Sequence, residues 1–122
     1  MEKYLYCLLL SLWANQASGA ESFKTGNEFL QQCNRFLKEK PETWDDVAQG
    51  SVCYGYVQGI SDLHAVFTDW GDIKLQWCVP EGTRASQLAL VAAKYMEAHP
   101  EQLESTAASL VANAFIDAYP CN

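Results

Sequence analysis

Cys53-Tyr54-Gly55-Tyr56-Val57-Gln58-Gly59-Ile60-Ser61-Asp62 is the stretch of sequence around which the rest of the chain is organised. If this stretch and the residues after it form a helix, one face of that helix is apolar. This face comprises Cys53, Tyr56, Ile60 and Phe67, with Val57 and His64 beside them. A face of this kind belongs in a protein core. The pattern therefore predicts a central helix from about Val47 to Phe67.

Two glycines lie inside this predicted helix, at Gly55 and Gly59. Each costs roughly 1 kcal/mol relative to alanine in a helix interior. We therefore expect a neighbouring helix to approach the backbone closely at both positions. The Gly-x-x-x-Gly pattern of membrane helices does not apply, because polar residues interrupt the apolar run, namely Gln58, Ser61, Asp62 and His64.

A first helix is predicted on the N-terminal side of the central one. Thr25 and Glu28 have the spacing of a capping box, and apolar residues then recur at helical spacing as far as about Lys38. Pro41 ends this helix. Residues 39–46 then form a polar, acidic connection that holds Trp44.

Two more helices are predicted on the C-terminal side. After the turn at 69–72 and an extended connection at 73–79, Thr83 is the expected N-cap of a helix that ends near His99. Pro100 is expected at the first position of the last helix, with Glu101 and Glu104 in its first turn. Its core stripe comprises Leu103, Ala107, Leu110, Ala114 and Ala118, and Pro120 stops it. The predicted fold is all-α, a compact four-helix domain of two antiparallel helical hairpins.

The N-terminal segment has the features of a secretory signal peptide. Lys3 precedes an apolar run at 5–14 that is too short to span a bilayer, and Ser18-Gly19-Ala20 supplies the small residues of a cleavage site. We expect residues 1–20 to be removed and residues 21–122 to form the domain. A retained membrane anchor is the alternative.

The chain of 122 residues is acidic, with 15 Asp and Glu against 8 Lys and Arg and a net charge of -7. Without a cluster of basic residues, nucleic acid is not an expected partner, and an anionic membrane surface is disfavoured. The balance suits a basic partner, although a plain acidic surface that keeps the protein soluble is the simpler interpretation.

Removal of the signal peptide leaves four cysteines, Cys33, Cys53, Cys78 and Cys121, which in a short exported chain predicts two disulfides. Of the three connectivities that four cysteines allow, the hairpin geometry favours Cys33 with Cys53 and Cys78 with Cys121. A non-reducing peptide map that joins Cys33 to either of the last two would refute it. The sequence has no Cys-x-x-Cys pair and 2 histidines, so no metal or cofactor site is expected.

An ordered set of motifs resembles a known family. The central stretch at 53–62 is followed by Cys78-Val79-Pro80, Gln87-Leu88, Lys94-Tyr95, His99-Pro100-Glu101 and Tyr119-Pro120-Cys121. In this order the set is similar to the Rap/Tai-type immunity proteins of type VI secretion systems, over residues 23–121. Within it, Gly55, Tyr56, Gly59, Asp62, Pro80 and Pro120 are expected to have structural roles.

The resemblance implies an exported, disulfide-bonded protein of the bacterial periplasm, commonly a homodimer. Members of the family bind a peptidoglycan amidase effector protein and block its active site. Catalysis by this chain is not expected, because paired cysteines cannot act as nucleophiles and neither His64 nor His99 has an evident catalytic partner.

Exposed turns are the best candidates for binding such a partner. Trp70, flanked by Asp69 and Asp72, is the first choice, against the alternative that it caps the core. The other candidates are His99, Glu101 and Tyr54. For Asp62 a structural hydrogen bond is the expected role, and for His64 a place in the core.

Two other functions fit the same features. A periplasmic acid-stress chaperone would also be small, helical and disulfide-bonded, and it would lose structure and expose apolar surface as its carboxylates are protonated. An uncharacterised helical binding module is the third possibility. Binding to an amidase separates the first function from the other two.

Overall fold

The computed structural model describes residues 23–37 and 40–122, and within them the fold is all-α, as predicted. The helices are α2 (Gly26–Leu37), α3 (Trp44–Asp69), α4 (Ala85–Ala98) and α5 (Ala107–Ala118), with a short 3-10 helix, η2 (Pro100–Gln102). No helix in these ranges is long and apolar enough to cross a membrane. The predicted signal peptide lies outside the described residues.

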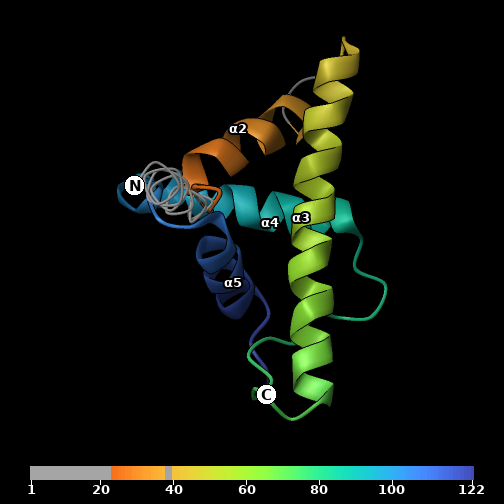
Figure 1. Ribbon diagram of the computed structural model, residues 1–122, viewed down its shortest axis with the longest axis vertical. Coiled ribbons are helices and arrows are strands. Elements are labelled where there is room, and N and C mark those ends of the chain that lie inside the picture. The colour runs from red at the N-terminus through yellow and green to blue at the C-terminus, as the bar shows by residue number, and fades with distance from the viewer. Residues whose placement is uncertain (1–22, 38–39) are drawn as a thin grey trace, which may run out of the picture.

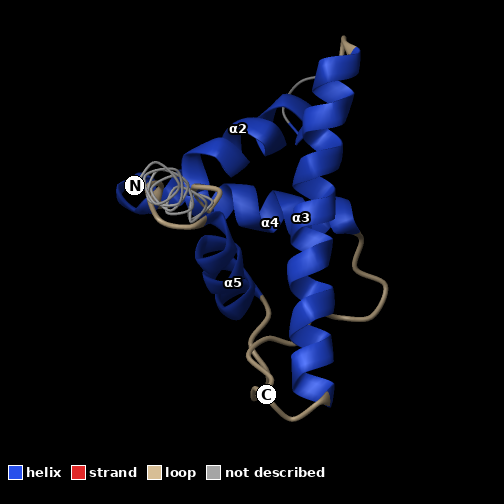
Figure 2. Ribbon diagram, viewed as in Figure 1, coloured by secondary structure: helices blue, strands red, loops and turns tan. Residues whose placement is uncertain are grey.

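Helix α3 is the longest element and forms one side of the molecule, with α4 crossing it and α2 and α5 at its flank (Figure 1). The connecting segments between the helices are loops (Figure 2). Helix α2 packs on α3 and α4, and α4 packs on α3 and α5. The core between them is closed by fully buried side chains from all four helices: Phe29, Cys33, Cys53, Val57, Met96, Leu110, Val111 and Phe115.

Both predicted disulfides are confirmed, and each joins the two members of a helical pair. Cys33 of α2 bonds to Cys53 of α3, and both cysteines are fully buried. Cys78, in the loop before α4, bonds to Cys121, which follows α5 and is exposed. The first disulfide is therefore part of the core. The second joins the segment before α4 to the segment after α5.

The start of α2 is held by a capping box, as predicted. The Thr25 N–H donates to the Glu28 carboxylate at 2.8 Å, and the Glu28 N–H donates to the Thr25 hydroxyl at 3.3 Å. The next residue, Gly26, lies against the chain before α5, where a Cβ would be 2.5 Å from Leu110 Cδ1 and 3.0 Å from the Leu103 carbonyl oxygen. Only glycine fits there without a shift of the backbone.

Helix α3 begins three residues earlier than predicted, at Trp44. Thr43 and Asp46 form a second capping box, in which the Asp46 N–H donates to the Thr43 hydroxyl at 3.2 Å and the Thr43 N–H donates to the Asp46 carboxylate at 3.1 Å. The N–H of Glu42 also donates to that carboxylate, and these bonds lower the pKa of Asp46 below 3.8. Trp44 is thus helical, and it is not part of the connection.

The boundaries of the last two helices also differ from the prediction. Helix α4 starts after Arg84, whose N–H donates to the Gln87 side chain at 2.9 Å, while the Thr83 hydroxyl donates instead to the Pro80 carbonyl at 2.7 Å. Pro100 begins the 3-10 helix η2, and α5 starts only after Thr106, which accepts from the Ser109 N–H. The start of the last α-helix is therefore set by the N-cap at Thr106 and not by Pro100.

The inward face of α3 is largely as predicted, because Cys53, Val57 and His64 are buried. The expectation for its glycines is wrong. Gly55 and Gly59 lie exposed on the opposite side of the helix, and a Cβ at either position would meet nothing within 4 Å. No described helix approaches them, so packing among the described residues does not offset their cost to the helix.

Candidate functional site

The loop that follows α3, residues 70–84, is held against the core by the side chain of Trp77. The Trp77 ring stacks on the buried His64 ring with centroids 3.7 Å apart, and it meets Phe115 edge-on at 5.7 Å. Trp77 was not among the residues that the sequence predicted to be functional. The alternation of apolar residues at 73, 75, 77 and 79 was the available signal, because it places one side of an extended segment on the core.

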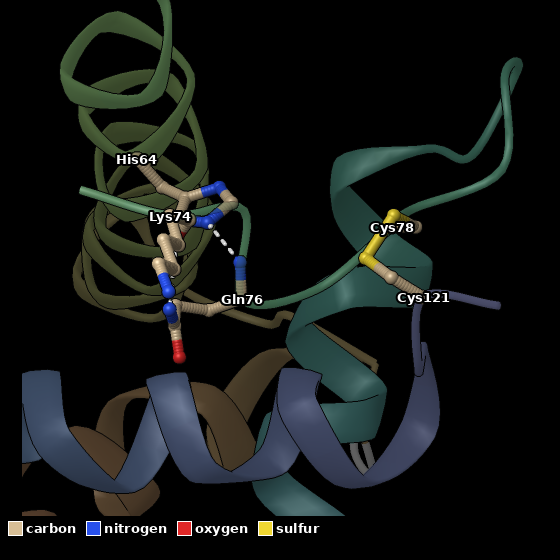
Figure 3. Close-up of a disulfide and its surroundings, with 5 residues drawn as sticks. All are labelled: His64, Lys74, Gln76, Cys78 and Cys121. Atoms are coloured by element: carbon tan, nitrogen blue, oxygen red, sulfur yellow. Dashed lines mark hydrogen bonds between the residues drawn. A yellow bond between two sulfur atoms is a disulfide. The ribbon is translucent and has the colours of Figure 1, made fainter. Parts of the chain in front are cut away.

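Two polar contacts add to this attachment. The Gln76 N–H donates to Nε2 of His64 at 3.0 Å, as Figure 3 shows beside the Cys78–Cys121 disulfide. The Cys78 N–H donates to the Tyr119 carbonyl at 2.8 Å. The loop is therefore tied to α3 at one point and to the chain after α5 at another.

His64 is a core histidine, as the sequence predicted, and its state follows from these contacts. Because Nε2 accepts a hydrogen bond, the ring is neutral, and burial lowers the pKa of His64 below its ordinary value of 6.5. Its role is to position the loop. Among the described residues, no group of three or more His, Cys, Asp or Glu side chains could hold a metal ion.

The part of the loop nearest the end of α3 presents the predicted binding residues to solvent. Trp70 is 70% exposed and lies edge-on against Phe67, with ring centroids 5.8 Å apart. Asp69 and Asp72 on either side are exposed as well. Gly71 between them has a φ of 79°, a conformation that suits glycine, and it turns the chain at this point.

Further apolar surface lies next to Trp70. Ile73 is 41% exposed and Leu75 is 53% exposed. Beside them is a shallow hollow of about 360 Å³ between the loop and the last turns of α3, with Asp69, Leu75 and Trp77 in its lining. An exposed aromatic ring, two aliphatic side chains and two carboxylates thus share one fixed corner of the molecule.

The second predicted turn, at His99 to Glu101, lies at the far end of α4, away from the C-terminal end of α3 (Figure 1). His99 is half-buried, stacks on Tyr95 at 4.1 Å and donates from Nδ1 to the Tyr95 carbonyl at 2.7 Å. Glu101 is exposed. The His99 side chain is thus engaged with Tyr95 at the end of α4. Of the two candidates in this turn, Glu101 is the one whose side chain is exposed to a partner.

The third candidate, Tyr54, is half-buried and packs against the core, and burial raises its pKa. Tyr56 packs on Phe29 with centroids 5.3 Å apart, which agrees with its predicted place on the core face. The structure therefore does not bring the candidates together in one site. Trp70, Asp69 and Asp72 form one surface, and Tyr54 and the 99–101 turn lie elsewhere.

Asp62, for which a structural hydrogen bond was expected, is exposed on α3, and among the described residues it has no hydrogen-bond partner. Pro80 and Pro120 are exposed too; Pro80 accepts two hydrogen bonds from Thr83, and Pro120 follows the end of α5.

A polar hollow of about 600 Å³ between α2 and the start of α3 was not foreseen. Its lining includes Lys24, Arg35 and Asp45, and Arg35 and Asp45 form an ion pair at 2.7 Å. Both partners are more than half exposed, so this pair contributes little to stability.

In a comparison with protein families, the chain matches a model described as Rap1a immunity proteins over residues 25–121. The matched region contains all the described helices and both disulfides. No curated protein and no solved structure matches the chain.

Proposed function

Because the chain belongs to the Rap1a immunity protein family, we propose that it protects a bacterial cell by binding and inhibiting a peptidoglycan amidase toxin of a type VI secretion system. The observation that carries the proposal is the family match over residues 25–121, which spans the complete helical domain. We further propose that the protein acts in the periplasm, after removal of residues 1–20, and that it is a homodimer.

The geometry of the loop after α3 supports this function. An inhibitor needs no catalytic groups, only a surface that excludes substrate and buries a few well-placed side chains of its own. Trp70 is the type of residue that most often supplies binding energy at interfaces, and the contacts of Trp77 and Cys78 hold its loop in place before binding. A surface fixed in advance loses little entropy on binding.

The charge of the chain and its disulfides fit the same proposal. A net charge of -7 suits a toxin with a basic rim around its active site, since opposite charges speed association. Two disulfides are typical of proteins that fold in an oxidising compartment such as the periplasm.

The test is a pull-down and an amidase assay with the mature, oxidised protein and a purified peptidoglycan amidase encoded next to it. We expect a stable complex and loss of peptidoglycan hydrolysis. Full hydrolysis without a complex would exclude immunity against that amidase, leave the family and fold unchanged, and favour the acid-stress alternative. That alternative predicts exposure of apolar surface as the pH is lowered through the carboxylate range.

Replacing Trp70 with alanine tests the proposed contact surface. We expect Trp70→Ala to weaken binding to the amidase by at least about 1 kcal/mol, roughly a fivefold rise in Kd, because a large exposed ring is lost from the interface. Calorimetry on the complex measures this change.

The matched control is Trp44→Ala. Trp44 is 89% exposed and lies at the opposite end of α3, so its loss should leave binding unchanged. Equal affinity of Trp70→Ala and the wild type would remove the 69–72 turn from the interface.

A further inference from the structure

The hollow of about 360 Å³ between the last turns of α3 and the loop that follows it combines apolar walls with a single charge. Apolar side chains in its lining include Ala65, Leu75 and Val79. Among the described residues that line it, Asp69 is the one charged side chain, because His64 is neutral. Its volume is at the lower end of the roughly 300–1,000 Å³ of ligand pockets, so it suits a single side chain.

Two residues in the lining have hydroxyl groups without a hydrogen-bond partner. Ser61 and Thr68 lie two helical turns apart on one side of α3, and the oxygen of each is buried with no partner among the described residues. Such unpaired groups lower stability and are uncommon in folded proteins. Rotation about the Cα–Cβ bond turns either oxygen toward the hollow, where a ligand that donates hydrogen bonds would supply the missing partner.

The electrostatics of this corner of the molecule favour a cation. The negative end of the α3 dipole lies at Asp69, and the last turn of the helix has no basic residue to offset it. The Asp69 carboxylate forms no ion pair with any described residue. Lys74, which lies near His64 in Figure 3, does not belong to the lining. A positively charged group that enters the hollow therefore meets an uncompensated carboxylate.

We propose that this hollow receives an arginine side chain of the protein that binds at Trp70. The aliphatic part of that arginine packs against Leu75 and Ala65, and its guanidinium group donates to the Asp69 carboxylate and to the Thr68 hydroxyl. Arginine fits these acceptors better than lysine, because its planar head group pairs with a carboxylate in a bidentate manner and keeps further N–H groups for the hydroxyls.

This inference rests on the proposed function for the identity of the partner, and it adds a second, opposite contact to the surface at Trp70. The Trp70 ring projects toward the partner, whereas the hollow beside it accepts a side chain from the partner. The stacking of Trp77 on His64 and the Cys78–Cys121 disulfide fix the loop wall of the hollow before binding. A preformed hollow loses little entropy when it is filled.

The first experiment tests the hollow without the amidase. The mature, oxidised chain is titrated at neutral pH with N-acetyl-arginine methylamide and followed by NMR at the Ala65 methyl group and the Trp77 indole N–H. We expect saturable shifts with a Kd of about 1–10 mM, because one side chain makes few contacts. The matched probe is N-acetyl-citrulline methylamide, which has nearly the same shape and no charge. It should bind at least about tenfold more weakly, since its bonds to Asp69 are not charge-assisted.

A matched pair of charge variants locates the site. Asp69→Asn should weaken binding of the arginine probe at least about tenfold, and it should raise the Kd of the amidase complex by a similar factor. Asp62→Asn is the control, because it removes an exposed carboxylate of the same helix that lies outside the lining. It should change neither Kd by more than about twofold.

A third variant separates a binding role from a structural one. Thr68→Val replaces the unpaired hydroxyl with a methyl group of similar size. We expect the arginine probe to bind about threefold more weakly, because one hydrogen bond is lost. The melting temperature should rise, because the variant no longer buries an unpaired hydroxyl. Weaker binding together with a lower melting temperature would contradict a role for this hydroxyl as a waiting acceptor.

The remaining outcomes distinguish a failure of the hollow from a failure of the proposed function. No saturable shift up to about 100 mM arginine probe, or equal binding of the citrulline probe, would exclude an arginine site and leave amidase inhibition unaffected. Equal binding of N-acetyl-lysine methylamide would overturn the choice of arginine over lysine. An amidase complex that Asp69→Asn does not weaken would remove the hollow from the interface. If the arginine probe binds and the wild type forms no amidase complex, the site is supported and the proposed partner is wrong.

Discussion

The inner and outer faces of α3 both carry apolar residues, but only the inner face is buried. On the inner face, Cys53, Val57 and His64 are buried by the disulfide, by the other helices and by Trp77. On the outer face, Val52 and Leu63 are exposed beside two glycines, at which a Cβ would meet no described atom within 4 Å. The comparison teaches that apolar residues at helical spacing can lie on a buried face or on an exposed face of the same helix, and that the spacing alone does not distinguish the two.

Removing the inner disulfide should have the largest effect. In the double variant Cys33→Ala with Cys53→Ala, the free energy of unfolding should fall by about 3 kcal/mol, because a cross-link between residues 20 apart no longer limits the unfolded chain. Chemical denaturation under oxidising conditions measures the loss. A loss below about 1 kcal/mol would mean that the inner face does not depend on this bond.

A matched pair of valines gives the second comparison. Val57→Ala should cost about 2 kcal/mol, since two buried methyl groups are lost from a side chain with no exposure. Val52→Ala, at 43% exposure on the outer face, should change the stability by no more than about 0.5 kcal/mol. Similar losses at the two positions would contradict the assignment of the faces.

Acid should weaken the inner face through His64. Burial lowers the pKa of this histidine in the folded protein, so below about 6.5 the unfolded chain binds a proton that the folded chain does not. The free energy of unfolding should therefore fall as the pH drops from 7.5 to 5.5, by less than the Val57→Ala loss.

The control is His64→Gln, in which this part of the pH dependence should be absent. Asp69, which lines the same hollow as His64, and Lys74, drawn beside His64 in Figure 3, remain in both proteins. The lowered pKa of Asp46 affects stability only as the pH falls below about 5, outside this range. An unchanged pH profile in the variant would show that His64 does not cause it.

The smallest expected effect is a gain in stability on the outer face. Gly59→Ala should raise the free energy of unfolding by about 0.5–1 kcal/mol in dilute, monomeric protein, because alanine is the better helix former and its Cβ meets nothing. Gly26→Ala is the opposite control. Its Cβ would lie 3.0 Å from the Leu103 carbonyl oxygen and 3.2 Å from Leu103 Cα, so the backbone would have to shift, and we expect the variant to be less stable. Thermal melts of both variants test the pair.

The sequence predicted the helices and the disulfides because their signals are local. The Thr25–Glu28 capping box, the apolar spacing of the core face and the order of the cysteines all act within one helix or one pair. The same type of signal at Thr43 and Asp46 was available and would have placed the start of α3 correctly. The proline at 100 misled because it suits a 3-10 turn as well as an α-helix.

The candidate site was less predictable, because it depends on contacts between distant parts of the chain. Exposure of Trp70 follows from its position in a turn, but the attachment of its loop through Trp77 and His64 needs the packed core. The glycines at 55 and 59 led to the prediction of a closely packed neighbouring helix, which is wrong. The spacing of residues in a sequence shows which side of a helix they share, but it does not show which element packs against that side.

The two disulfides also differ in when they can close. A chain that enters an oxidising compartment from its N-terminus can join Cys33 to Cys53 once these two residues have emerged, before α4 and α5 are present. Cys78 must wait for 43 further residues before its partner arrives. During that interval it is the free thiol open to a mistaken partner, so the fidelity of oxidation depends on the first pair closing early.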